Sequence, residues 1–287
     1  MSAVYRKELR GFFTSMIGYV FIAFVLLIAG IFITLTNFRT GYPNFEYSLG
    51  SISMILIFVV PILTMRVFAE ERRSKTDQLL YSLPMSVTEI VIGKYLAAVT
   101  VFAVPCAVMC LYPVIMSFYG KVSFTSAYGA MLGFFLLGCA LIAVGVFMSS
   151  LTESQVISAV ISFGAMIVIY MMSSISSLIP AASSASYIAF AVVILLIALI
   201  VYYMTKNYWM AFSVAAALEL VLAIFFFTGS SRFEGLFSRA LGWLSFFARL
   251  DNFIYGIFDI TSLVYYLSVA AVFVFLTMQS VEKRRWS

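Results

Sequence analysis

Long apolar runs separated by short polar stretches dominate the pattern of this chain. The runs are about twenty residues long, which is the length that a helix needs to cross a hydrocarbon layer about 30 Å thick. Eight spans are expected, at residues 16–36, 51–68, 95–118, 127–149, 155–173, 187–204, 208–228 and 260–281. The pattern predicts an all-α, polytopic membrane helix bundle that forms a single transmembrane domain over residues 1–287.

The first fifteen residues have a pattern of their own. Tyr5, Leu9 and Phe12 fall on one helical face and Arg6 and Lys7 lie toward the other, which predicts an interfacial helix over residues 1–15. The alternative is a plain positive flank of the first span. The apolar run that follows is too long for a signal-peptide core and has no small-residue cleavage site, so we expect the first span to be retained.

Turn and small residues punctuate the spans. Residues 36–51 predict a polar loop, and Pro61 predicts a kink in the second span. Gly129 and Gly133 have the GxxxG spacing that is typical of helix packing faces in membranes.

The C-terminal half contains two further features. Only three residues separate the spans at 187–204 and 208–228, which predicts a helical hairpin over residues 187–228. Residues 229–259 mix arginines with Phe, Leu and Trp, so we expect one or two short amphipathic helices on the extracytoplasmic surface.

Composition and charge agree with a membrane location. Apolar residues make up 64% of the chain and charged residues 10%, with a mean hydropathy of +1.10. The net charge of +5 does not indicate nucleic acid, because the basic residues gather at span ends. Twelve of the seventeen Lys and Arg residues lie in alternate segments that include both termini. This bias predicts cytoplasmic N- and C-termini in a multi-pass protein of the bacterial plasma or inner membrane.

Several kinds of chemistry are excluded by residue type. The chain has no histidine, which excludes histidine bases, histidine-ligated zinc and histidine-containing triads. Cys106, Cys110 and Cys139 all lie inside apolar runs and are interpreted as packing residues. No catalytic residue and no metal ligand is therefore predicted.

The long polar segment at residues 66–94 is the exception to the apolar pattern. Ser86 and Glu89 form a capping box that starts a helix continuing into the third span, and Pro84 ends whatever precedes it. This leaves a short separate helix at residues 76–81 that carries Leu79 and Leu80 into the cytoplasm. Two interpretations stay open: a docking element for a soluble protein, or a solvated connector whose leucines lie on lipid headgroups.

Three stretches of this sequence resemble one known family. The segment FAEERRSKTDQLLYSLPMS…EIVIGKY is similar to the signature between the second and third spans of ABC-2 type permeases. The ending LDNFIYGIFD…VYYLS…EKRRW and the opening KELRGFFTS resemble the gliding-motility and nitrous-oxide-maturation branch of that family. The resemblance implies a type V exporter-like transmembrane domain, and the hairpin departs from it as an insertion of two spans.

The resemblance also implies a role for the polar segment. The helix at 76–81 would be the coupling helix that docks on a separate ATPase subunit, braced by the helix at 1–15. The positions that map to this docking signature are Glu70, Glu71, Thr76, Gln78, Leu79, Leu80 and Pro84. Gly93-Lys94 lacks the other residues of a phosphate-binding loop, so the chain is not expected to be an enzyme or to bind a cofactor. ATP and magnesium would be bound by the partner ATPase.

The predicted function is that of a permease subunit that exports an unknown substrate, working as a pair of identical or homologous subunits with two ATPases. An anchor that transmits ATPase motion to extracytoplasmic machinery without transport is the main alternative. An ion-coupled secondary transporter is less well supported, because the two halves show no internal repeat. An intramembrane hydrolase lacks a second buried catalytic partner.

Glu219 lies in the middle of the span at 208–228, where a carboxylate is costly. Three explanations stay open: a protonated group hydrogen-bonded inside the bundle, a partner for a polar or basic residue of another span, or an ion or proton site. Its place in the inserted hairpin leads to the hypothesis that the hairpin docks an auxiliary membrane subunit with an extracytoplasmic domain. Membrane lipid is the other expected contact.

Overall fold

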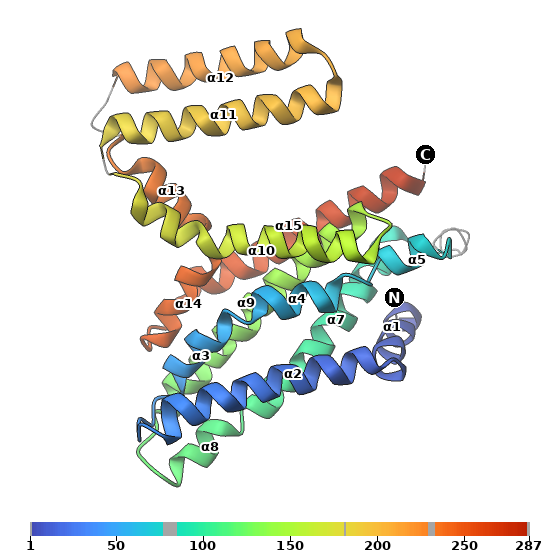
Figure 1. Ribbon diagram of the computed structural model, residues 1–287, viewed down its shortest axis with the longest axis vertical. Helices are drawn as coiled ribbons and strands as arrows, with labels where there is room; N and C mark the ends of the chain where they lie inside the picture. Colours follow the sequence, from blue (N-terminus) through green and yellow to red (C-terminus); the bar gives the residue numbers. More distant parts are fainter. Residues whose placement is uncertain (1, 77–84, 181, 229–232, 286–287) are drawn as a thin grey trace. The chain divides into compact units, whose positions relative to one another are not determined.

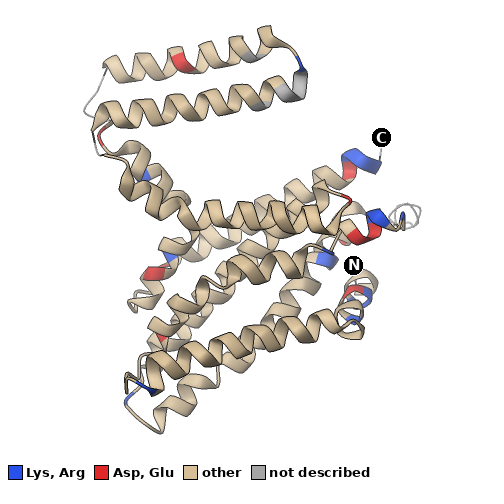
Figure 2. Ribbon diagram, in the orientation of Figure 1, with Lys and Arg blue, Asp and Glu red and all other residues tan. Residues whose placement is uncertain are grey.

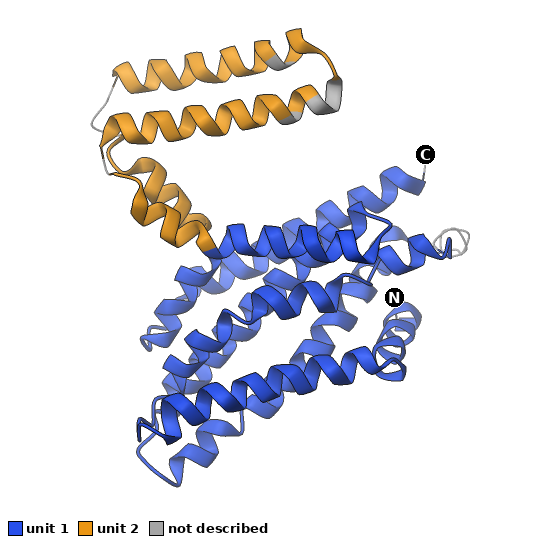
Figure 3. Ribbon diagram, viewed as in Figure 1, with its two compact units in different colours: residues 1–170, 246–287 blue, residues 171–245 orange. Residues whose placement is uncertain are grey.

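The computed structural model describes residues 2–76, 85–180, 182–228 and 233–285, and within these ranges the chain is helical and contains no strand. It divides into two compact units, residues 1–170 with 246–287 and residues 171–245 (Figure 3). The helices of unit 1 are α1 (Ser2–Thr14), α2 (Met16–Ile33), the π-helix η1 (Thr34–Phe38), α3 (Phe45–Ser53), α4 (Leu56–Thr64), α5 (Ala69–Arg73), α7 (Val87–Met109), α8 (Tyr112–Ser117), α9 (Phe124–Leu151), α14 (Phe246–Ile254) and α15 (Ile260–Arg285) (Figure 1). Helix α10 (Gln155–Leu178) begins in unit 1 and ends in unit 2, which also holds α11 (Ser183–Thr205), α12 (Tyr208–Thr228) and α13 (Leu236–Leu244).

The predicted membrane helix bundle is confirmed. Among the described residues, six helical segments are long and apolar enough to cross a membrane, and there are seven if the bent pair α3–α4 counts as one span. A further apolar helical stretch, Ser183–Leu199 of α11, is shorter than this length. The count of eight spans stays a prediction, as does the interpretation of the chain as a single transmembrane domain.

Helix α9 is the centre of unit 1 and packs against α4, α7, α14 and α15. Its glycines allow these close approaches: a Cβ on Gly138 would clash with the Phe102 ring of α7, and one on Gly145 would clash with Thr64 Oγ1 of α4. Of the two glycines of the expected GxxxG packing face, only one packs closely against another helix. Gly133 faces Phe253 of α14, whereas a Cβ on Gly129 would meet nothing within 4 Å.

The polar loop expected at residues 36–51 is wrong in its second half. Phe45, Leu49 and Ile52 are buried and repeat at helical spacing, so the chain forms α3 here and buries Glu46 with it. Helices α3 and α4 meet at a 56° bend. The bend lies at Met54 and Ile55, between the two helices and several residues before Pro61, where the kink was expected.

Unit 2 contains the predicted hairpin of α11 and α12. Lys206 ends α11 in a left-handed conformation (φ 50°), and its N–H bonds to Tyr202 O. Asn207 then begins α12: its Oδ1 accepts from the N–H groups of Trp209 (3.0 Å) and Met210 (3.4 Å). The C-cap of α11 at Lys206 and the N-cap of α12 at Asn207 together reverse the direction of the chain.

The semi-polar segment at 229–259 contains the two short helices that were expected, α13 and α14. Helix α14 buries Phe246, Phe247, Leu250, Phe253 and Ile254 against α3 and α9, so its apolar face packs on protein. Its extracytoplasmic location stays a prediction.

Candidate functional site

The charged residues of unit 1 gather mainly at one end of its helices. Figure 2 shows blue and red segments on α1, on α5 and on the last turn of α15, the end of unit 1 at which both chain termini lie. Ser86 Oγ accepts from Glu89 N–H at 3.3 Å, and the Glu89 carboxylate accepts from Ser86 N–H at 3.3 Å. The predicted capping box is therefore confirmed, and it starts α7 at this end.

A buried lysine on α7 is the centre of this site. The Lys94 side chain is fully buried, and its Nζ lies 2.9 Å from Glu8 Oε1 on α1 and 2.8 Å from Glu71 Oε2 on α5. The same ammonium donates to Val67 O at 2.8 Å and lies 5.2 Å from the centre of the Phe68 ring. Lys94 thereby joins three segments of the chain: the N-terminal helix, the segment that leads into the long polar loop, and the helix that leaves it.

A second lysine extends the network. Lys7 Nζ on α1 donates to Glu71 Oε1 at 2.6 Å, so the Glu71 carboxylate is held between Lys94 and Lys7. Helix α5 lies beyond the apolar part of its span. Burial acts to raise the pKa of Glu71, but the Lys94 and Lys7 ammonium groups outweigh it and lower that pKa below its ordinary value. For Lys7, burial lowers the pKa, and the Glu71 carboxylate more than compensates, so the net direction is upward. Both groups are held in their charged forms.

Close packing brings α1 against α7. A Cβ on Gly93 would lie 3.2 Å from the Val4 side chain, and Tyr5 Oη lies 3.1 Å from Thr100 Oγ1. Val4 and Phe12 are buried. The predicted amphipathic helix is thus present, and its apolar face packs on α2 and α7 of its own unit.

Helix α9 holds the other side of the site. Ser149 Oγ accepts from Phe68 N–H (3.1 Å) and Ala69 N–H (3.3 Å), and it donates to Met65 O (3.2 Å). These bonds satisfy backbone groups where the chain leaves α4 and enters α5, groups that have no intrahelical partner at a helix end. The start of the polar segment is therefore anchored to α9 as well as to α7.

A comparison with protein families identifies the family of the chain. A model described as ABC-2 family transporter protein matches residues 9–214, which is most of the chain. The chain belongs to the ABC-2 transporter family. This family supplies the membrane component of a transporter, and the component is not itself the ATPase. Searches of curated proteins and of solved structures found no match.

The residues that the sequence assigned to ATPase docking fall into two groups in this ABC-2 protein. Glu70 receives two hydrogen bonds from Arg66, at 2.7 Å and 2.6 Å, and Glu71 belongs to the Lys94 network. Thr76 is exposed, and its backbone N–H donates to Glu71 O at 3.0 Å. The other four residues, Gln78, Leu79, Leu80 and Pro84, lie outside the described residues.

Lys94, Glu8 and Ser149 were missed by sequence reasoning. In the sequence, Lys94 stands beside Gly93 as an incomplete phosphate-binding loop. One signal was available: Lys94 is a single cation two turns into an apolar helix, where a charge needs a partner. Its partners could not be named, because Glu8 is 86 residues away along the chain.

The second sequence block that resembles the family, at residues 250–259, also has a structural explanation. Asp259 begins α15 by accepting from Thr261 N–H (2.9 Å), from Ser262 Oγ (2.6 Å) and from Asn252 Nδ2 (3.2 Å). Gly256 adopts φ 77° between α14 and α15, a conformation that favours glycine. This block therefore builds the junction of two helices.

The described residues contain no cluster of three or more metal-ligating side chains. A small cavity of about 160 Å³ lies beside the Lys94 network, lined by residues of α1 and of the chain around α5, including Glu8, Arg66 and Glu70. Its lining is partly polar, and its size suits a few water molecules. The site forms a structural link that joins α1, α5, α7 and α9 at the base of the polar segment.

Proposed function

We propose that the chain is the permease subunit of an ABC transporter and that a separate ATPase drives it by docking on the segment at residues 66–94. Membership of the ABC-2 family supports the general class, and the sequence signature supports the docking segment. In this proposal, Glu70, Glu71, Thr76, Gln78, Leu79, Leu80 and Pro84 form the docking surface, and Leu79 and Leu80 are its apolar anchors.

The Lys94 network is the observation that carries the proposal. The polar segment leaves the bundle at Val67 and returns to it at α7, and Lys94 Nζ bonds directly to Val67 O at 2.8 Å. Both ends of the segment are thus held together and joined to α1 through Glu8. A displacement of the segment is then transmitted to α1, α4 and α7 at once, since packed helices shift as bodies and do not deform continuously.

The remaining parts of the proposal rest on the resemblance and on the charge bias. Two permease copies, or this permease and a homologue, would work with two ATPases that bind the ATP and magnesium, and the movement of substrate would be export. The termini would face the cytoplasm at the bacterial plasma or inner membrane. The ending LDNFIYGIFD supports placement in the gliding-motility and nitrous-oxide-maturation branch.

The docking surface is tested by replacing Leu79 and Leu80 together with Asp in a tagged chain expressed in its own host. We expect the wild-type chain to co-purify with vanadate-sensitive ATPase activity and the Leu79→Asp/Leu80→Asp variant to lose nearly all of it, because the variant places two carboxylates where the proposal requires an apolar contact. The variant should still enter the membrane and elute as a single species in size-exclusion chromatography.

Leu178→Asp is the matched control, because Leu178 is a strongly exposed leucine at the end of α10, outside the docking segment. Its co-purified ATPase activity should equal that of the wild type. Unchanged ATPase activity in the Leu79→Asp/Leu80→Asp variant would show that the segment is not the docking surface.

A further inference from the structure

Unit 2 presents two helices that are largely exposed. No described residue of α12 is buried, and in α11 only Ser186 is. Between Ile188 and Val201, α11 consists entirely of apolar residues, and α12 is apolar apart from Ser213 and Glu219 over residues 209–227. Surfaces of this composition are stable in hydrocarbon, so Glu219 is the one unusual feature of the hairpin.

Glu219 lies close to the midpoint of α12. It is the twelfth residue of a helix of 21 residues, and at 1.5 Å per residue it is about 14–17 Å from either end. A hydrocarbon layer is about 30 Å thick. A long Lys or Arg side chain reaches the interface from such a position more easily than a short glutamate does. The carboxylate therefore needs a partner at this depth.

Among the described residues of the hairpin, none near the middle of the helices supplies a partner for Glu219. The apolar stretch of α11 contains no side-chain donor, and the Ser213 hydroxyl donates to Met210 O at 3.0 Å. The rest of the chain supplies no cation at this depth either, because its seventeen Lys and Arg residues lie near span ends or in polar and short amphipathic segments. The one that lies furthest inside a span, Lys94, is already held by Glu8 and Glu71. A cation that neutralises Glu219 at mid-membrane must come from another polypeptide.

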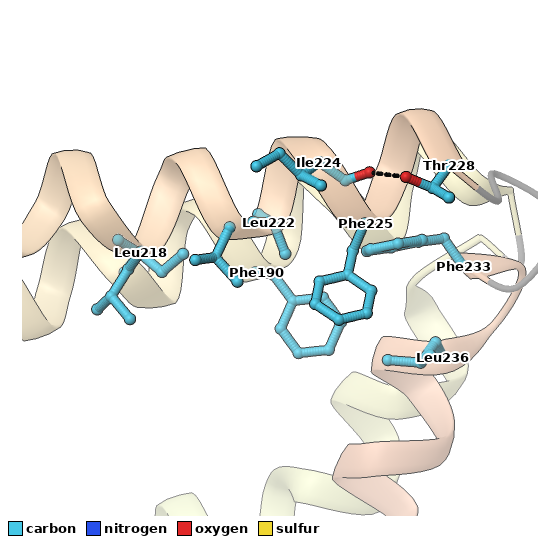
Figure 4. Close-up of a pocket in the computed structure, with 10 residues that line it drawn as sticks. Phe190, Leu218, Leu222, Ile224, Phe225, Thr228, Phe233 and Leu236 are labelled. Carbon is cyan, nitrogen blue, oxygen red and sulfur yellow. Dashed lines mark hydrogen bonds between the residues drawn. The ribbon is translucent and has the colours of Figure 1, made fainter.

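An apolar hollow of about 540 Å³ lies in unit 2, and Figure 4 shows the residues that line it. Its walls come from α11 and α12 and from the start of α13, and they include Phe190, Leu218, Leu222 and Phe225. Glu219 is not among the lining residues, but Leu222, at one edge of the α12 face that lines the hollow, follows Glu219 by three residues and is therefore its neighbour on the helix surface. The Thr228 hydroxyl at one end is engaged with Ile224 O at 2.6 Å. Apart from Thr228, the side chains that line the hollow are apolar.

We propose that the α11–α12 hairpin is the docking surface for a membrane-spanning helix of a partner subunit that carries a lysine or arginine near its middle. Glu219 pairs with that cation, and the hollow receives the apolar side chains that flank it. The charge fixes both the depth and the identity of the partner helix, since a helix without the cation leaves the Glu219 carboxylate uncompensated in hydrocarbon. A second copy of this chain does not fit, because it has no cation at mid-span.

The test uses the full chain in phosphatidylcholine vesicles with a synthetic partner helix. The probe is a Leu/Ala peptide of 24 residues with a single central Lys, and the matched probe has Leu at that position. A photoreactive benzoylphenylalanine in place of Leu222 reports occupancy of the hollow through its cross-linking yield at increasing peptide-to-protein ratios. We expect the Lys peptide to bind about 3- to 30-fold more tightly than the Leu peptide.

Variants of the chain assign the preference to Glu219. It should disappear in Glu219→Gln, persist in Glu234→Gln, and invert in Glu219→Lys, which should instead select a peptide with a central Glu. Benzoylphenylalanine at the strongly exposed Phe227 serves as the control for location and should cross-link both peptides equally.

Three results would overturn the proposal. The first is equal binding of the Lys and Leu peptides to the wild type, which would indicate that Glu219 needs no cation from a partner helix. The second is a preference for Lys that persists in Glu219→Gln. The third is cross-linking of one copy of the chain to another that is lost in Glu219→Gln, which would make the hairpin a self-association surface. The ATPase of the proposed function takes no part in this experiment, so the two proposals stand or fall separately.

Discussion

Replacing Lys94 with Met is the sharpest test of the buried ion network. The variant keeps the length of the side chain and removes its charge, so Glu8 and Glu71 lose the cation that lies 2.9 Å and 2.8 Å from them. Breaking a buried ion pair by removing one partner costs about 3–5 kcal/mol. Two features favour the lower end of this range: the two carboxylate side chains keep 16% and 14% exposure, and Glu71 keeps Lys7 at 2.6 Å.

A loss of about 3 kcal/mol corresponds to local opening that is about 10²-fold more frequent. Hydrogen exchange measures this opening by segment, since amides exchange when their helix opens. In Lys94→Met we expect amides of α1 and of residues 69–73 to exchange about 10²-fold faster than in the wild type. Amides in the middle of α9 should be unaffected, because its packing on α15 does not involve Lys94.

Two further variants separate the charge from the packing. Lys121→Met removes an exposed lysine outside the network and should leave the exchange of α1 unchanged. The triple variant Glu8→Gln/Glu71→Gln/Lys94→Met removes the uncompensated carboxylates and should restore most of the protection of α1. The reasoning is refuted if α1 stays fully protected in Lys94→Met, or if the triple variant exchanges faster than the single one.

Two more predictions concern pH and packing. Because the pKa of Glu71 is lowered below its ordinary value of 4.5, its charged form stabilises the fold at neutral pH, and this contribution is lost only as the pH falls below 4.5. The difference in Tm between wild type and Glu71→Gln should accordingly be constant above that pH and shrink below it, and a difference that already shrinks near pH 7 would contradict the assignment. Gly133→Ala should lower the Tm by the equivalent of about 1–3 kcal/mol, because its Cβ would lie 2.8 Å from the buried Phe253 ring. The matched variant Gly129→Ala, with nothing within 4 Å, should be neutral or slightly stabilising, and equal losses in both would show that α14 does not pack on Gly133 as described.

Much of the architecture could be predicted because it depends on local patterns. The apolar runs, the turn at Lys206 and Asn207, and the capping box of Ser86 and Glu89 involve residues within a few positions of one another, and all of them are present in the structure. The α3 helix is not predicted by the local pattern, because its polar residues indicate a loop. Its buried face depends on α9 and α14, which lie far along the chain.

The candidate site was predicted only in outline. The polar segment identified Glu70 and Glu71 as charged residues at its start, but nothing local distinguishes their roles. Packing distinguishes them: Glu70 pairs with Arg66 within its own segment, whereas Glu71 lies between Lys94 and Lys7. The structure leaves the predicted docking helix untested, since Gln78, Leu79, Leu80 and Pro84 lie outside the described residues.

The amino-acid sequence by itself determined that the chain is a membrane helix bundle and roughly where its long apolar helices lie. Hydrocarbon requires helices of a given length whose backbone hydrogen bonds are satisfied within the helix. Both features depend only on residues that are consecutive in the sequence. Only the tertiary structure decided what Lys94 does, because its carboxylate partners come from α1 and α5, far away along the chain or across the polar loop. An unpaired lysine in an apolar helix is destabilising. The fold brings two carboxylates and a carbonyl within 3 Å of Lys94, and these contacts connect the polar segment to the bundle.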